Sequence, residues 1–240
     1  RLRSFYLDRG YLEFTVEQPQ VTISPDRKDI RITITVHEGE PYKVRSVKLA
    51  GNLIGLDKEI NGLVDIKPEE TFSAAKANGS AKAITDYLGE LGYAFANVNP
   101  NPQLDRAKHE ADLTFYVDPS RRVYVRRIQI GGNTRTRDEV VRREMRQQEA
   151  AWYDAKDIKT SRDRVDRLGY FSDVNVKTDP VPGSPDQVDV NVDVKEKPTG
   201  MINLGVGYGS SEKAILSAGI SEDNVFGSGT NLTLQLNTSK

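Results

Sequence analysis

Cysteine is absent from the 240-residue sequence, and histidine occurs only at His37 and His109. Without cysteine the chain can form no disulfide and no thiolate metal site, and it has no cysteine nucleophile. This composition suits an exported protein that avoids stray oxidation. Each histidine lies beside an acidic residue near an expected strand edge, so we interpret both as ordinary exposed side chains. We therefore expect no catalytic, cofactor-binding or metal site, and no enzyme activity.

The sequence also lacks a long apolar run and an excess of charge of one sign. No segment approaches the roughly 20 apolar residues of a membrane-spanning helix, so any membrane contact must be made by strands. The 34 lysines and arginines are balanced by 35 acidic residues, which disfavours nucleic acid as a partner. The chain starts at Arg1, inside an expected helix and without a signal peptide, and it stops at Lys240 just after an expected strand. We expect both ends to be boundaries within a longer protein.

One unit is repeated along the chain. A helical pattern that ends in a Gly-Tyr pair occurs three times, with glycines at Gly10, Gly92 and Gly169. Each Gly-Tyr pair is followed by a strand in which apolar and polar residues alternate, the pattern of a half-buried strand. These strands cover residues 30–36, 111–117 and 188–194. The glycines are 82 and 77 residues apart and the strand ends 81 and 77, so helix and strand repeat together.

The front half of the unit occurs only twice. Strands that end in a Gly-Asn turn are expected at 44–52 and 125–133. We therefore predict a partial unit over residues 1–40 and complete units over 41–118 and 121–196. Each complete unit has the order β-α-α-β-β, which makes the fold class α+β. In the last unit, Thr136 to Glu139 fits a capping box at the start of the first helix.

Residues 197–240 contain three strands of a different kind. Strands of roughly 10 residues with an apolar and a small or polar face are typical of a transmembrane β-barrel. The residues predicted to face lipid in the first strand are Ile202, Leu204, Val206 and Tyr208. They alternate with Gly205, Gly207 and Gly209, which either weaken strand pairing to form an openable seam or relieve crowding in the lumen. Because small membrane barrels need about 8 strands, we expect the others beyond Lys240. A soluble three-stranded meander that packs on a neighbour is the other interpretation of this segment.

The order of elements, the Gly-Asn strand end and the Gly-Tyr helix stop resemble the POTRA module. The last unit is similar to the final POTRA domain of the outer-membrane barrel insertases in residues 141–147, 167–171 and 183–189. This resemblance covers essentially the whole chain. It implies a partial third and complete fourth and fifth POTRA domains, followed by the first antiparallel strands of a transmembrane β-barrel. It also implies the cell outer membrane of Gram-negative bacteria, with the POTRA domains in the periplasm.

The resemblance implies a function in outer-membrane protein assembly. Unfolded outer-membrane proteins would dock by adding a strand to an exposed sheet edge, and their folding and insertion would be promoted without covalent chemistry. The implied partners are these clients, accessory assembly lipoproteins and outer-membrane lipid. A POTRA-barrel polypeptide transporter, of the two-partner secretion type or a translocation and assembly module, is the alternative function. A purely soluble periplasmic binding domain is a third, if residues after Gly200 are soluble.

A cluster of charged residues follows the predicted capping box of the last unit. By resemblance, Arg142, Glu144 and Arg146 lie in the region that faces an accessory lipoprotein. The other interpretation is a solvated helix face, on which Asp138 and Arg142 form an i,i+4 pair. Between the two helices of this unit lie Trp152 and Tyr153, which we predict to cover the core.

Overall fold

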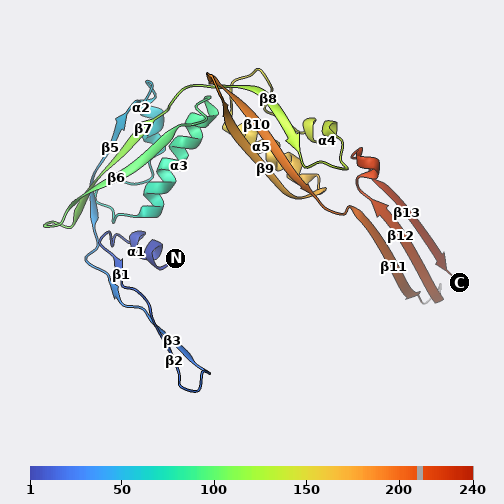
Figure 1. Cartoon of the computed structure of the whole chain (residues 1–240), viewed down its shortest axis with the longest axis horizontal. Coiled ribbons are helices and arrows are strands. Elements are labelled where there is room, and N and C mark those ends of the chain that lie inside the picture. Colours follow the sequence, from blue (N-terminus) through green and yellow to red (C-terminus); the bar gives the residue numbers. More distant parts are fainter. Residues whose placement is uncertain (210–212, 240) are drawn as a thin grey trace. The chain divides into compact units, whose positions relative to one another are not determined.

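The computed structural model describes residues 1–209 and 213–239, and it divides into two compact units. The first unit comprises residues 1–88 and 95–120, and the second comprises 89–94 and the chain from 121 onward. Figure 1 shows the order of the elements along the chain.

The first unit begins with a short helix and a hairpin. Helix α1 (Leu2–Leu7) is followed by β1 (Thr15–Val16), which pairs with β4 (Val36–His37) in an antiparallel arrangement. Between them, β2 (Gln20–Ile23) and β3 (Ile30–Thr33) form the projecting end of the hairpin (Figure 1). The strand predicted over 30–36 is therefore divided into two strands. Its isoleucines at 30, 32 and 34 are exposed rather than half-buried, whereas Val36 is half-buried as expected.

A three-stranded sheet with two helices follows in the same unit. Its elements are β5 (Lys43–Gly51), α2 (Asp57–Gly62), α3 (Ala74–Glu90), β6 (Asn97–Asp105) and β7 (Glu110–Asp118). The strand order is β5-β7-β6, with β5 parallel and β6 antiparallel to the central strand β7. Alternate residues of β7 from Ala111 to Val117 are buried, so the predicted alternation places one face of this strand in the core.

The second unit contains the same arrangement. Its elements are β8 (Tyr124–Gly131), α4 (Asp138–Arg142), α5 (Ala155–Arg167), β9 (Phe171–Val181) and β10 (Ser184–Glu196). The strand order is β8-β10-β9, again with a parallel first strand and an antiparallel third strand. Helix α5 lies along the sheet in Figure 1 and packs on β9. The predicted α+β class and the β-α-α-β-β order are confirmed.

The repeated glycines have a common conformation. Gly10, Gly92 and Gly169, which follow the helices, have φ values of +91°, +101° and +75°. This left-handed region is costly for residues with a Cβ atom, which explains why the same residue recurs after each helix.

The chain then forms a third sheet. Strands β11 (Gly200–Gly209), β12 (Lys213–Glu222) and β13 (Leu232–Ser239) are antiparallel in the order β11-β12-β13. A one-turn 3-10 helix, η1 (Val225–Gly227), lies between β12 and β13 (Figure 1). Within the described residues, no helix has the length and apolarity required to cross a membrane.

Candidate functional site

The outer edge of β5 carries unbonded backbone groups. The amide of Asn52 donates to the carbonyl oxygen of Val117 at 3.0 Å, so the backbone groups of Asn52 point toward β7. Along a strand, the backbone groups of successive residues point to opposite sides. Val47 and Leu49 are an odd number of residues from Asn52, so their N–H and C=O groups point away from β7. Nothing in the described part of the chain bonds these groups. Only the start of the edge is covered, where Val44 bonds to the loop that precedes α3.

The outer edge of β8 is closed by two side chains. The amide of Ile128 donates to Glu149 Oε1 at 2.7 Å, and Arg142 Nη2 donates to the Ile128 carbonyl oxygen at 3.2 Å. Arg142 Nη1 lies 3.5 Å from the same Glu149 oxygen. The two side chains therefore satisfy the backbone groups of Ile128 that an added strand would otherwise use.

The third strand of the first sheet has a proline-blocked edge. On β6, Pro100 and Pro102 pair with Phe115 and Leu113 of β7. Proline has no N–H, and it is tolerated in a sheet where that group would face outward. The outer edge of β6 therefore lacks donors at two alternate positions.

An ion pair joins the first and central strands in both units. Arg45 and Arg126 each lie at a β-bulge of the first strand, and their Nε atoms donate to Asp112 Oδ1 at 3.0 Å and to Asp189 Oδ1 at 2.9 Å. Hydrogen bonds from Arg45 and then Ser46 lower the pKa of Asp112 to about 2. Arg and Asp recur at matching positions of the repeat, so the sequence itself contains the signal for this ion pair.

A second repeated bond involves a buried serine. Ser161 Oγ on α5 accepts from the amide of Arg146 at 2.7 Å, and Ser80 Oγ on α3 accepts from the amide of Asp65 at 2.9 Å. Each serine also donates to a carbonyl four residues earlier in its helix. These serines fix the loop after the first helix to the second helix.

The three predicted partner residues do not form one exposed patch. Glu144 has only 17 % of its side chain exposed and accepts from Arg164 Nη2 at 2.7 Å. Arg142 is bonded to the edge of β8 as described above. Arg146 is exposed, and its guanidinium has no hydrogen-bond or ion-pair partner among the described residues. Of the three, only Arg146 is free to bind a partner without breaking a bond of this chain.

The aromatic pair between the helices behaves differently from the prediction. Tyr153 packs against the core, but Trp152 is 51 % exposed. The Trp152 ring lies 4.3 Å below the guanidinium carbon of Arg122 and meets the Tyr124 ring edge-on. The prediction that Trp152 covers the core is wrong, because it packs on these two surface side chains.

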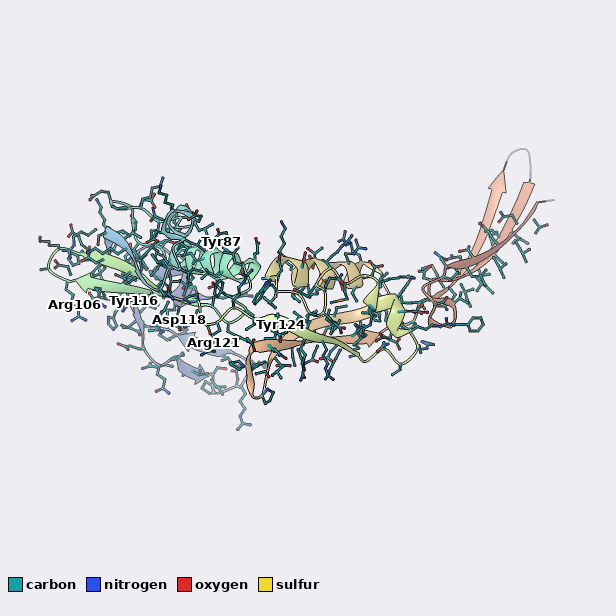
Figure 2. The ribbon with its side chains drawn as sticks, turned by 90° about the horizontal axis from the view of Figure 1, so that it is seen from above. Tyr87, Arg106, Tyr116, Asp118, Arg121 and Tyr124 are labelled. Atoms are coloured by element: carbon teal, nitrogen blue, oxygen red, sulfur yellow. The ribbon has the colours of Figure 1, made fainter. Side chains whose placement is uncertain are left out.

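Figure 2 labels Tyr124 in the second unit and Arg106 in the first unit. Arg106 Nε donates to Glu13 Oε1 at 2.7 Å.

Glu196, the last residue of β10, accepts several hydrogen bonds from the loop before α4. Its carboxylate accepts from the amide of Thr136 at 2.6 Å, from the amide of Arg135 and from the hydroxyl of Thr134. Burial acts to raise the pKa of Glu196, but these hydrogen bonds outweigh it and lower the pKa.

The predicted capping box is not formed. The N-cap of α4 is Arg137, without a side-chain capping bond, and Thr136 instead accepts from Asn224 Nδ2 at 2.8 Å. The amide of Arg137 donates to the carbonyl oxygen of Gly227 at 2.9 Å. The turn between β12 and β13 thus binds the Thr136 hydroxyl and the Arg137 amide, while the Thr136 amide donates to Glu196.

The third sheet presents an apolar face. Cross-strand register aligns Ile202 with Ile220 and Leu234, and the next row joins Leu204, Ala218 and Leu236. Five of these side chains are large and exposed, with Leu204 at 81 %. Val206 continues the same face, whereas the side chain of predicted Tyr208 lies outside the described residues.

The comparisons with known proteins define the class. The POTRA family, described as the surface antigen variable number repeat, matches residues 1–39, 42–120 and 123–197. The chain therefore belongs to the POTRA family, and the predicted resemblance is confirmed.

Within this family, the similarity is to the outer membrane protein assembly factor BamA. The structure of Haemophilus influenzae BamA POTRA3-5 is 37 % identical, covers 81 % of this chain and 77 % of that one, and has a TM-score of 0.78. BamA from Haemophilus ducreyi lacking POTRA domains 1-3 is 36 % identical over 82 % of this chain and 37 % of its own, with a TM-score of 0.74. Neisseria meningitidis BamA is 34 % identical over 100 % of this chain and 30 % of its own length. The chain spans about a third of the curated relatives it matches.

Proposed function

We propose that this chain is part of the central component of the outer-membrane β-barrel assembly machinery of a Gram-negative bacterium. The observation that carries the proposal is the direct succession of POTRA modules and an antiparallel sheet with one exposed apolar face. The modules would lie in the periplasm, and β11–β13 would be the first strands of a barrel in the cell outer membrane.

The modules would act as docks for unfolded outer-membrane proteins. An unfolded strand can add to a sheet edge through backbone hydrogen bonds, which makes little demand on client sequence. The unbonded groups of Val47 and Leu49 on β5 support this mechanism. It requires no covalent step, cofactor or metal.

The third sheet would meet lipid. Transfer of exposed apolar surface from water to hydrocarbon is favourable by roughly 25 cal/mol per Å². The row of Leu204, Ala218 and Leu236 and its neighbours would gain this energy in a membrane. The opposite face, with Gly205 and Ser217, would line the lumen.

Accessory lipoproteins would bind near α4. Arg146 offers a free positive charge there, and the Glu144–Arg164 pair lies beside it as a partly buried support. Partner contact at this face would therefore depend directly on Arg146 and indirectly on Glu144.

The proposal is tested with the full-length protein in vesicles of outer-membrane lipid. A urea-unfolded barrel client is added, and its folded form is followed by heat-modifiable migration and protease protection. We expect several-fold faster folding than with vesicles that hold an unrelated barrel without POTRA modules. Delivery of the client into the vesicle lumen without insertion would identify a polypeptide transporter instead, and an unchanged rate would exclude assembly.

A further inference from the structure

The two complete modules differ at the outer edge of their first strand. In the second unit, Glu149 and Arg142 bond both backbone groups of Ile128, as an added strand would. The start of β8 is also occupied, because Val125 exchanges two backbone hydrogen bonds with Ala150 and Ala151. An extended segment therefore finds no continuous row of free groups on β8.

The repeat allows the same positions to be located in the first unit. Buried Val141 corresponds to buried Ile60, 81 residues earlier. Ala150 corresponds to Glu69, since both have positive φ and both donate to the first strand of their sheet. The spacing of 81 residues therefore holds across the whole loop.

At this spacing, the closing residues of β8 have no equivalents in the first unit. Asn61 stands in place of Arg142, and Pro68 stands in place of Glu149. Proline has no side-chain acceptor, and no hydrogen bond joins Asn61 to β5 among the described residues. The backbone of Val47, which corresponds to Ile128, is therefore left open.

The remaining edges are less suited to a new strand. Pro100 and Pro102 remove donors from β6. On β9, Arg162 Nε donates to the carbonyl oxygen of Val174 at 3.1 Å, and Pro180 lacks an N–H. On β9 the free outward groups are confined to Val176 and Thr178, between the bonded Val174 and Pro180. Among the described residues of the two complete modules, no proline and no side-chain bond interrupts the outward positions of β5 from Val47 onward.

We propose that the edge of β5 from Val47 to Leu49 is the client-docking edge of these two modules, and that Arg142 and Glu149 close the corresponding edge of β8. The inference rests on the proposed function. The occupant is an extended segment with alternating apolar and polar residues. Its apolar side chains would lie beside half-buried Val47 and Leu49, and its polar ones beside exposed Lys48. This alternation is the pattern of a transmembrane barrel strand.

The test uses a matched pair of proline variants in the 240-residue chain in detergent micelles. Leu49→Pro removes an outward donor from the open edge, and Ile130→Pro makes the same change at the equivalent position of β8. The probe is a fluorescent peptide that copies residues 230–239. Anisotropy gives its total binding, and amide hydrogen exchange at Val47 and Leu49 gives the part bound at β5, separately from any bound at the unpaired edge of β11. Loss of one edge hydrogen bond predicts about tenfold weaker binding for Leu49→Pro and no change for Ile130→Pro. The double variant Arg142→Ala, Glu149→Ala should gain a second binding site.

Amide hydrogen exchange supplies a readout that needs no variant. In the wild-type chain, the peptide should protect the amides of Val47 and Leu49 and leave the amide of Ile130 unchanged. Binding without protection at β5, or equal weakening by both prolines, overturns the edge assignment but leaves docking by the modules intact. Absence of any peptide binding to the wild-type chain overturns both the edge assignment and the docking mechanism.

Discussion

In each complete module, one glycine at the end of the first strand lies close to the backbone of the central strand. A Cβ atom on Gly132 would lie 1.9 Å from the carbonyl oxygen of Val194, and one on Gly51 would lie 2.2 Å from that of Val117. Both glycines also have positive φ. The Gly-Asn strand end, which served as a turn marker in the sequence, is therefore also a point of close backbone approach.

Gly132→Ala is expected to destabilise the second unit by about 3 kcal/mol or more, because a left-handed conformation and a backbone clash add. Gly183 is a matched control, since its φ is +78° but no atom lies within 4 Å of its added Cβ. Gly183→Ala should cost only about 1–2 kcal/mol. Urea unfolding followed by the fluorescence of the single tryptophan, Trp152, measures both changes. Equal losses would show that the approach to Val194 does not matter.

At the scale of elements, most of the strands and helix ends of the two complete modules could be predicted from the sequence repeat. Period-two alternation and Gly-Tyr stops predicted the strands and helix ends of both modules, because these depend on local burial and backbone conformation. The capping box failed because Asn224, 88 residues away, takes the hydroxyl of Thr136. The edge closure was missed for the same reason, since the bond between Glu149 and Ile128 depends on tertiary placement. Local sequence patterns do not encode such long-range competition.

The α4 region gives a prediction that separates partner contact from internal support. Arg146→Glu should weaken lipoprotein association and change stability by less than about 0.5 kcal/mol, because the side chain is exposed and free. Glu144→Lys should also weaken association, but with a loss of about 1–2 kcal/mol of stability from the broken bond to Arg164. Pull-down and urea unfolding report the two effects. Lys108→Glu, an exposed reversal elsewhere, should change neither, and undiminished binding by Arg146→Glu removes the assignment.

At the scale of the whole molecule, the first strand of the third sheet, β11, is one of its two edge strands. In the order β11-β12-β13, one edge of β11 has no partner among the described residues. Gly205 and Gly207 in this strand add no side-chain contacts across the sheet, and each glycine costs roughly 0.5–1 kcal/mol relative to alanine. Crowding accounts for Gly205, because an added Cβ would lie 2.4 Å from Ser217 Oγ.

We expect β11 to form a weak seam with the last strand of the closed barrel, and clients to enter there. A disulfide engineered between these two strands of the full-length protein should stop client insertion, and reduction should restore it, because an added strand needs the free backbone edge of β11. The described chain has no cysteine, so an engineered pair within it would have no native competitor. Cysteines at Asn203 and Gly219, which are already paired across β11 and β12, provide the control disulfide that should leave insertion unchanged. If the seam disulfide also leaves insertion unchanged, the seam has no part in entry, and the glycines of β11 serve to relieve crowding inside the barrel.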